Sequence, residues 1–278
     1  MAYFLALGAA ILYGVSDFAG GLAARKKTTL VVFFIAQAAG LIALAMIQAL
    51  LPAATPTRAD VLWGAAAGLT GGVGVALLYH ALAIGAMAVV APTTAVCAVA
   101  IPVLISVLLG ERPSPLGAAG IALAIAAIIL VSRERSAKGA ASSRGIGIAL
   151  ASGVLIGLFF VSLARTERAA ALWPLVVARV LSVAVFGVVV VARRQPLGMP
   201  ARVAALTLVC GVLDGLANTL YLLATREGRL SLVVTLASLY PAATVLLARL
   251  FLRERLNPWQ RAGVVGALGA IVLIVRGD

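Results

Sequence analysis

Long apolar stretches separated by short polar breaks dominate this chain. Charges, prolines and glycines divide it into ten apolar segments, each of about the length that crosses a bilayer as a helix. The runs are continuously apolar, whereas a strand of a membrane barrel would alternate every second residue. The pattern therefore predicts an all-α membrane protein with ten transmembrane helices, at residues 2–24, 29–51, 60–82, 86–109, 114–132, 144–165, 169–192, 202–224, 228–251 and 257–275.

The chain also repeats itself. When it is slid against itself by 143 residues, Glu111-Arg112 falls on Glu254-Arg255, and no gap is needed between the first segment and the last. Further matches pair Gly14 with Gly157, Gly68 with Gly211, Pro115 with Pro258 and Gly120 with Gly263. The stretch RERSAKGAASSR between the copies has the composition of a linker. We expect a five-helix repeat at residues 1–132, a linker at 133–143 and a second five-helix repeat at 144–278.

The odd number of helices in each repeat sets its orientation. Because five crossings leave the chain on the opposite face, the second repeat enters the membrane inverted relative to the first. The basic residues of each half gather on faces that this inversion brings to one side of the membrane. Lys and Arg favour the cytoplasmic side, so the charge count predicts that both termini lie outside.

Composition narrows the class of protein further. Of the 278 residues, 63% are hydrophobic and 11% are charged, which leaves no room for a soluble catalytic domain. The net charge of +13 would suggest a nucleic-acid partner in a soluble domain, but here the basic residues fall mostly between apolar segments. One histidine and two isolated cysteines, Cys97 and Cys210, provide neither a metal-ligand cluster nor a nucleophile with a base. We expect no enzyme activity, no cofactor, no metal and no nucleic-acid partner.

The two halves close on similar phrases, LLGERPSPLGAAGIALAIAAIILV and LFLRERLNPWQRAGVVGALGAIVLIV. Glu111 follows a segment that carries Pro102, and Glu254 follows one that carries Pro241. With ten helices in two halves, these phrases resemble the EamA-like branch of the drug/metabolite transporter superfamily over essentially the whole chain. The resemblance implies a secondary transporter, commonly an exporter or exchanger of small metabolites, with a cavity between the halves. It also implies cytoplasmic termini, against the charge count, so the topology stays open.

Ionisable side chains inside the predicted helices are the first candidates for function. Such a group costs a few kcal/mol in hydrocarbon, so those that persist usually face a cavity or a partner. Asp17 lies in the last third of the first segment, in the stretch YGVSDFAGG, whose glycines permit close approach of another helix. We interpret Asp17 either as a site for a proton or cation or as a structural contact to a neighbouring helix.

The second half of the chain contains a further set of polar side chains inside its predicted helices. Arg179 and Asp214 lie near the middle of their segments, where an ion pair would remove two unpaired charges at once. Asp214, Asn218, Tyr221 and Thr225 recur at helical spacing and form one polar stripe, which faces water or substrate more readily than lipid. The matching positions of the first half are apolar, so we expect the second half to carry more of the binding.

Three further residues are candidates for the same site. Tyr79 and the single histidine, His80, lie near the end of the third segment, at a depth similar to that of Asp17. An imidazole beside a carboxylate could relay a proton, although a lone histidine near an interface is often only hydrogen-bonded. Gln37, in the second segment, is a weaker candidate for substrate binding.

Prolines interrupt the backbone hydrogen bonding of two segments. Pro92 and Pro102 lie in segment 86–109, and Pro241 lies in segment 228–251. Because proline removes a backbone donor and crowds the preceding turn, we expect hinges or kinks there, which would fit alternating access.

These features favour a secondary active transporter. Carboxylates, one guanidinium, and amide and phenol groups suit an amino-acid-like zwitterion or a small cation better than a polyanion, with efflux or exchange coupled to protons through Asp17 or Asp214. The alternative is a non-transporting membrane scaffold or interaction protein, which would leave Asp17, Arg179 and Asp214 unexplained. We expect a multi-pass protein of the bacterial inner (plasma) membrane, a monomer or homodimer whose partners are a small-molecule substrate and the lipid bilayer.

Overall fold

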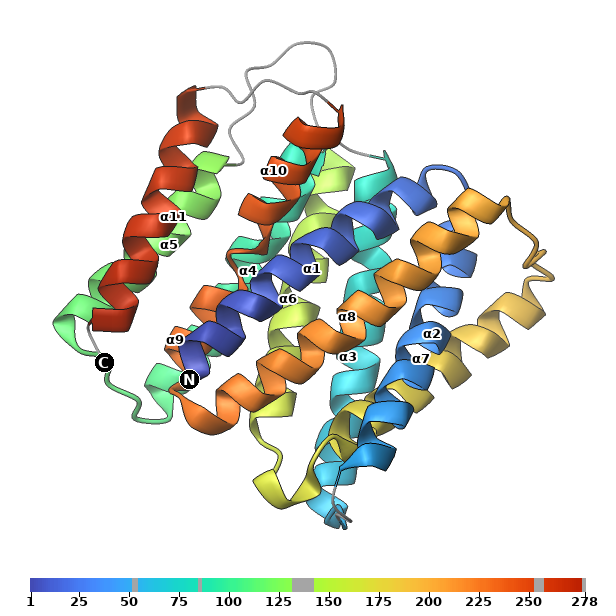
Figure 1. Cartoon of the computed structure of the whole chain (residues 1–278), viewed down its shortest axis with the longest axis horizontal. Coiled ribbons are helices and arrows are strands. Elements are labelled where there is room, and N and C mark those ends of the chain that lie inside the picture. Colours follow the sequence, from blue (N-terminus) through green and yellow to red (C-terminus); the bar gives the residue numbers. More distant parts are fainter. Residues whose placement is uncertain (52–54, 85–86, 132–142, 253–257, 277–278) are drawn as a thin grey trace.

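The computed structural model describes residues 1–51, 55–84, 87–131, 143–252 and 258–276, and every regular element in these ranges is a helix (Figure 1). The elements follow in the order α1 (Ala2–Ala24), α2 (Thr29–Leu50), α3 (Arg58–Ile84), α4 (Met87–Leu108), α5 (Pro115–Val131), α6 (Ser143–Ala164), the short 3₁₀ helix η1 (Arg168–Ala170), α7 (Trp173–Ala192), α8 (Ala201–Glu227), α9 (Leu230–Ala237), α10 (Tyr240–Leu252) and α11 (Pro258–Arg276).

Apolar helices of bilayer length make up most of the bundle. In the described ranges, six helices are long and apolar enough to cross a membrane, namely α1, α2, α3, α6, α7 and α8. Shorter apolar stretches lie in α4, in α5, across α9 and α10, and in α11. The prediction of an all-helical membrane protein is confirmed. The predicted segments match the helices one for one except at 228–251, which is divided into α9 and α10.

The division of that segment has a local cause. α9 ends at Ala237 and α10 begins at Tyr240, so Pro241 lies in the first turn of a new helix, where its missing N–H costs little. The hydroxyl of Ser238, in the turn between the helices, is buried and has no partner among the described residues. A helix boundary therefore lies directly before the predicted hinge at Pro241.

The other two prolines lie in a helix without such a break. α4 is helical from Met87 to Leu108, and Pro102 is buried within it. The side chain of Pro92 lies outside the described residues. Hinge motion at any of the three positions stays a prediction.

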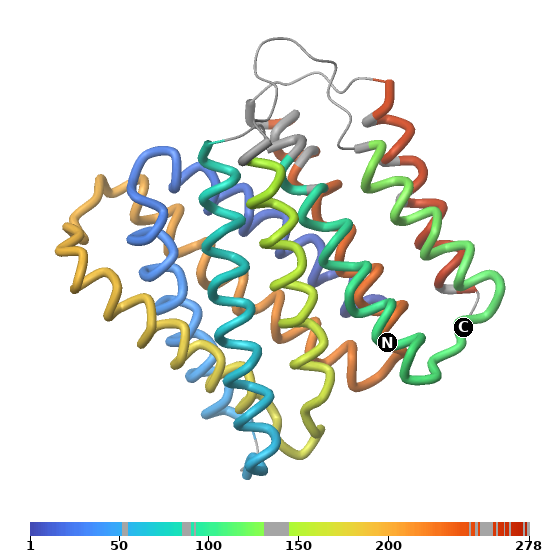
Figure 2. Tube along the Cα trace, turned by 180° about the vertical axis from the view of Figure 1, so that it is seen from behind, coloured from blue at the N-terminus to red at the C-terminus, as the bar shows by residue number. Residues whose placement is uncertain are grey.

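Helices of the two halves pack against each other in matched pairs. α1 packs along α8, and α6, which corresponds to α1 at the offset of 143 residues, packs along α3. In the same way α4 packs on α6, while α9 and α10 pack on α1. Two pairs of direct counterparts also touch, α2 with α7 and α5 with α11, and the second pair forms one edge of the bundle in both views (Figures 1 and 2).

Glycines at matched positions allow two of these contacts. A Cβ atom at Gly68 of α3 would lie 2.6 Å from the carbonyl oxygen of Ala178 on α7. At the matched position of the other half, Gly211 of α8 leaves no room for a Cβ atom beside the carbonyl oxygen of Ala36 on α2. Such close backbone approach holds helices together in lipid, where the hydrophobic effect contributes nothing between them.

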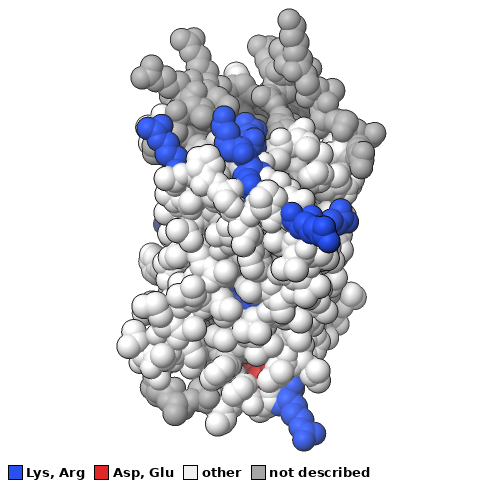
Figure 3. Space-filling model, turned by 90° about the vertical axis from the view of Figure 1, so that its right-hand side faces the viewer, with Lys and Arg blue, Asp and Glu red and all other residues white. Residues whose placement is uncertain are grey.

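The outer surface is apolar across its middle. On the face in Figure 3, Lys and Arg gather at the upper end, and the middle is almost entirely uncharged. Exposed basic residues follow the ends of α1 and α7 and lie at the start of α8, namely Arg25, Lys26, Arg193, Arg194 and Arg202. α1 begins and α11 ends at the opposite end of the bundle (Figures 1 and 2). A wide apolar band with charge at its margin is the surface expected of a protein that sits in a bilayer.

Candidate functional site

A pocket lies at the centre of the bundle, among α1, α2, α3, α6, α7, α8 and α10. The empty space within it, including the part that is open to solvent, is about 580 Å³. Most of its wall is apolar. Its polar side chains are Tyr13, Asp17, Gln37, Arg179, Ser182, Asp214, Asn218 and Tyr240, so three come from the first half and five from the second.

Matched positions of the two halves line this pocket together. At the offset of 143 residues, Tyr13 corresponds to Ile156, Asp17 to Phe160, Gly71 to Asp214 and Val75 to Asn218, and all eight belong to the pocket wall. In each of these pairs one residue is polar and the other is not. The pocket therefore lies where the two halves meet, and its chemistry is asymmetric.

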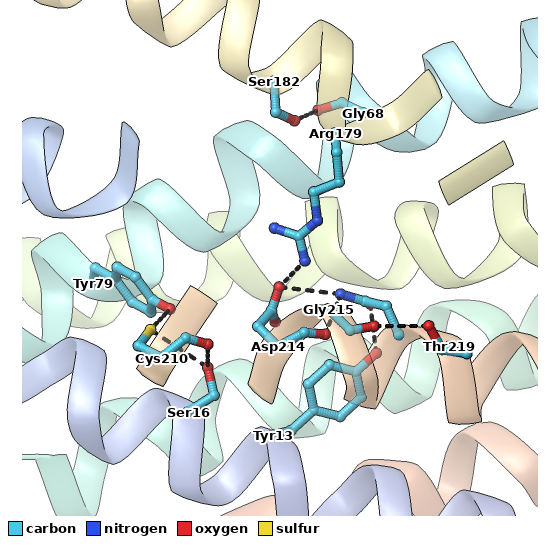
Figure 4. A network of polar contacts seen from close by, with 11 residues as sticks. Tyr13, Ser16, Gly68, Tyr79, Arg179, Ser182, Cys210, Asp214, Gly215 and Thr219 are labelled. Carbon is cyan, nitrogen blue, oxygen red and sulfur yellow. Dashed lines mark hydrogen bonds and ion pairs between the residues drawn. The ribbon is translucent and has the colours of Figure 1, made fainter. Parts of the chain in front are cut away.

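An ion pair joins α7 to α8 in the pocket wall. Nη2 of Arg179 donates to Oδ2 of Asp214, so the pair that the sequence suggested is formed (Figure 4). Only 7% of the Arg179 side chain and 13% of the Asp214 side chain are exposed. A buried pair of this kind is stable only when both charges keep their partners, because either one alone would be an uncompensated charge.

Asn218 and Tyr13 extend this ion pair into a network. Asp214 and Asn218 are four residues apart, which places them on one face of α8. Nδ2 of Asn218 donates to the backbone oxygen of Asp214 at 2.8 Å and to its Oδ2 at 3.1 Å. The hydroxyl of Tyr13, on α1, donates to Oδ1 of Asn218 at 2.6 Å. The network thus connects α1, α7 and α8.

Two polar side chains of the pocket stand outside this network. Asp17 is 7% exposed, and within the described part of the chain no donor reaches its carboxylate. Gln37 is 5% exposed, and its Oε1 accepts no hydrogen bond from the residues that the structure describes. A buried polar group without a partner is uncommon in folded proteins and calls for a ligand or a functional explanation. Their roles in binding a substrate or proton stay predictions.

Aromatic rings form the wall beside these groups. The ring centroid of Tyr13 lies 6.1 Å from that of Phe160 and 6.4 Å from that of Tyr240, both in edge-to-face arrangements. Tyr221 lies behind Phe160, with ring centroids 4.5 Å apart, and donates to the Phe160 carbonyl oxygen at 3.2 Å. Tyr221 is fully buried and does not line the pocket. Of the predicted stripe, Asp214 and Asn218 reach the pocket, whereas Tyr221 supports its wall.

The structure also places Tyr79 and His80 outside the pocket. The hydroxyl of Tyr79 lies 2.8 Å from Sγ of Cys210, and the hydroxyl of Ser16 donates to the Cys210 carbonyl oxygen at 2.9 Å (Figure 4). Tyr79 therefore packs α3 against α8 and α1. His80, the next residue, is exposed. The structure does not bring its imidazole to the pocket that holds Asp17, and nothing in it supports the expected proton relay.

Tyr13, Ser182 and Tyr240 belong to the pocket but were not expected from the sequence. Tyr13 lies one helical turn before Asp17, and Ser182 lies one turn after Arg179, so helical spacing from the two charged residues could have found both. Tyr240, which also lines the pocket, is the first residue of α10. No spacing in the sequence predicts that start.

Polar contacts tie the helices together at the end of the bundle where the chain begins. The carboxylate of Asp60, at the start of α3, accepts hydrogen bonds from the N–H of Thr57 at 2.9 Å, from its hydroxyl at 2.7 Å and from the N–H of Glu167 at 2.8 Å. Nη2 of Arg226, at the end of α8, donates to the carbonyl oxygens of Glu167 at 3.0 Å and Ala171 at 2.6 Å. We call Asp60, Glu167 and Arg226 the clasp. It joins α3 and α8 to the segment between α6 and α7.

Side chains that could bind a metal ion do not form a cluster in the described part of the chain. Within the described ranges, no three His, Cys, Asp or Glu side chains lie close enough to hold a metal ion.

The fold and the pocket define a class of protein: a bundle of helices long and apolar enough to cross a membrane, with a pocket among them that holds charged side chains, which is the form of a membrane transporter. A sequence model of the EamA-like transporter family matches residues 1–133 and again residues 143–276. The chain belongs to the EamA-like transporter family, a family of transporters rather than of enzymes. It is thus an integral membrane transporter of the drug/metabolite type.

Solved structures share this fold. Twenty-eight chains of solved structures match, and one of them, described as "Crystal structure of protein", superposes with a TM-score of 0.72 at 17% sequence identity. The match covers 98% of this chain and 95% of that chain, so the fold agrees over nearly the whole length of both. No curated protein matches the sequence.

Proposed function

We propose that this protein is a secondary active transporter that moves small metabolites, either amino-acid-like zwitterions or small cations, by efflux or exchange. The central pocket carries the proposal, because Asp17, Arg179 and Asp214 are largely buried there within apolar helices. Charged groups at that depth are costly, and they commonly mark the path of a substrate or ion. A scaffold protein would gain nothing from them.

Transport would follow from motion of two inverted five-helix repeats, residues 1–132 and 144–278. The matched contacts of α1 with α8 and of α6 with α3 support this proposal, since each half makes the same kind of contact on its side of the pocket. The boundary between α9 and α10 beside Tyr240 supports it as well, because discontinuous helices commonly form transporter sites near the bilayer midplane. Rocking of one repeat against the other would expose the pocket to each face in turn.

Coupling to protons would use Asp17 or Asp214. Asp214 is held by Arg179 and Asn218, whereas no described donor reaches Asp17. Asp17 can therefore take up a proton without breaking an ion pair, which makes it the first of the two to test.

The proposed setting is the bacterial inner (plasma) membrane. One chain supplies all the side chains of the pocket. We therefore propose that each chain carries its own transport site, either as a monomer or as one half of a homodimer.

Transport by purified protein in liposomes tests the proposal. A panel of labelled amino acids and amines is offered with and without a pH gradient. The wild-type protein should accumulate at least one compound and lose that accumulation when the gradient is dissipated.

Asp17→Asn or Asp214→Asn should remove the pH dependence of transport. Thr225→Val is the matched control, because the Thr225 hydroxyl bonds to the Leu222 carbonyl oxygen and neither residue lines the pocket. Unchanged transport at every pH in both Asn variants would remove the proton step. A folded protein that moves no compound would favour the scaffold alternative.

A further inference from the structure

The polar side chains of the pocket divide into two groups. Arg179, Asp214, Asn218 and Tyr13 form one connected network. Ser182 donates to the Gly68 carbonyl oxygen at 2.8 Å (Figure 4). In contrast, Oε1 of Gln37 on α2 is buried without a donor, and no described residue forms a hydrogen bond or ion pair with the carboxyl group of Asp17 on α1. The free hydrogen-bonding capacity of the pocket is therefore concentrated on two helices of the first half.

The unused atoms determine what kind of group can bind. An ionised carboxylate only accepts hydrogen bonds, and Oε1 of Gln37 is also an acceptor. A buried acceptor left without a donor costs free energy comparable to a lost hydrogen bond. A ligand that donates several N–H bonds would remove this cost at both residues.

Charge leads to the same class of ligand. The pocket wall holds one cationic side chain, Arg179, and two acidic ones, Asp17 and Asp214. Arg179 is already paired with Asp214, whereas no cationic side chain of the described residues pairs with Asp17. A ligand carboxylate would have to displace Asp214 from Arg179 and would also be repelled by Asp17. A ligand cation meets neither obstacle.

The walls of the pocket suit an apolar cation. Tyr13 lies one helical turn from Asp17, and its ring packs edge-to-face with Phe160 and Tyr240. Aromatic rings attract cations through their negative faces and also provide apolar contact area. An ammonium group held at Asp17 would have these rings beside it.

We propose that the ligand of this pocket is a monovalent organic cation, with a protonated primary amine bound by Asp17 and Gln37 and an apolar body against Tyr13, Phe160 and Tyr240, and that a carboxylate on the ligand weakens binding. Within the zwitterions and small cations proposed above, the inference selects the cations. It rests on the proposal that this pocket is the transport site.

Binding of three related probes tests the inference. Phenethylamine, phenylalanine and 3-phenylpropionate share a phenylethyl body and carry an amine, a zwitterion and a carboxylate. Equilibrium binding of labelled phenethylamine to purified protein in lipid nanodiscs, with the other two as competitors, should rank the amine about tenfold or more above phenylalanine, and 3-phenylpropionate should not compete. Equal or tighter binding of phenylalanine, or no binding of phenethylamine up to millimolar concentration, would overturn the inference.

Four variants locate the binding to named atoms. Asp17→Asn should weaken phenethylamine binding about tenfold or more, and Gln37→Leu by a smaller factor. Ser16→Ala is the matched control, since the Ser16 hydroxyl bonds to Cys210 outside the pocket and its loss should leave affinity unchanged. Gln37→Glu adds a second carboxylate and should tighten amine binding, a gain that misfolding cannot produce. Unchanged affinity in both Asp17→Asn and Gln37→Glu would contradict the assignment.

A blocking variant separates this inference from the proposed function. Ser182→Trp places a bulky ring in the pocket wall. If liposomes carry phenylalanine but not phenethylamine, and Ser182→Trp abolishes that transport, the pocket is the transport site and the choice of cations is wrong. If no compound of the panel is transported by the folded wild-type protein, the proposed function itself fails.

Discussion

The phenol of Tyr13 on α1 donates a 2.6 Å hydrogen bond to Oδ1 of Asn218 on α8, across 205 residues of sequence. The two residues belong to different halves of the chain. Because α1 and α8 also pack along each other, this bond fixes the polar network of α8 to a helix of the opposite half. It therefore holds the side chain of Asn218, and through it Asp214, in one position at the pocket wall.

Tyr13→Phe should lower stability by about 1 kcal/mol, because it removes this bond and leaves Oδ1 of Asn218 without its donor. The midpoint of thermal unfolding, followed by fluorescence-detected size exclusion, measures the loss. Tyr240→Phe is the matched control, since it also lies in the pocket but its hydroxyl reaches the Ala91 oxygen only at 3.5 Å. Equal unfolding midpoints for the two variants would show that the Tyr13 hydrogen bond contributes no more to stability than the long contact of Tyr240 does.

Breaking the Arg179–Asp214 pair should be more costly. Arg179→Met leaves the Asp214 carboxylate buried without its counterion, and we expect a loss of about 3 kcal/mol or more. The double variant Arg179→Met/Asp214→Leu removes both charges and should recover most of that loss. The yield of folded protein and its thermal midpoint distinguish the variants. A double variant less stable than Arg179→Met would show that the pair itself, and not the stranded charge, provides the stability.

The matched glycines Gly68 and Gly211 lie in close helix contacts, so the stability of the fold should be sensitive to substitution at both positions. Gly68→Ala and Gly211→Ala should each destabilise the fold by about 2 kcal/mol, because the new methyl group meets a backbone oxygen of α7 or α2 that cannot move aside alone. Gly147→Ala, in α6, is the control, since no described atom outside the backbone of its own helix lies within 4 Å of its Cβ position. That variant should be neutral or slightly stabilising because alanine favours the helix. If all three variants unfold at the same temperature, the close contacts do not hold the halves together.

Asp60→Asn should open the bundle at the end where the chain begins. Each carboxylate oxygen of Asp60 accepts one backbone N–H, and the amide replaces one of these oxygens and removes the charge, which weakens the clasp between α3 and the segment after α6. A single cysteine introduced by Ser182→Cys, with Cys97 and Cys210 replaced by serine, should then react about fivefold faster with an impermeant thiol reagent added from that side, the factor that about 1 kcal/mol provides.

A surface pair supplies the control for the clasp. Glu227 pairs with Arg168 at 3.3 Å, but the two side chains are 47% and 65% exposed. Exposed pairs contribute about 0–1 kcal/mol, so Glu227→Gln should leave the labelling rate unchanged. Faster labelling in both variants would mean that any loss of charge at this end has the effect attributed to Asp60.

The helices could be predicted from the sequence because a helix that crosses a bilayer needs an apolar run of bilayer length. Continuous apolar runs of bilayer length gave the helices, and the ion pair of Arg179 with Asp214 followed from two opposite charges at similar depth. The break before Tyr240 could not be placed, because proline is tolerated both inside a membrane helix and in its first turn.

The pocket residues were predicted less completely for a related reason. Helical periodicity shows which residues share a face, but it does not show how far that face extends into the cavity. Tyr221 shares the stripe of Asp214 and Asn218, yet it packs behind Phe160. Tyr79 and His80 are adjacent in sequence and point to different surroundings, one buried and one exposed. Depth within the bundle depends on neighbours that are distant in sequence.

Gly71 and Asp214 occupy matched positions of the two halves but differ in chemistry, and this difference requires that the two halves have different sequences. Two separate, identical half-length chains assembled about a twofold axis would have to present the same residue at both positions, so that one carboxylate would always oppose another. Joining the halves in one polypeptide removes this restriction. One copy keeps a glycine, which makes space for the Phe159 ring, while the other provides an acid for Arg179. A cavity that distinguishes one end of its ligand from the other is thereby available to a fold made of two similar parts.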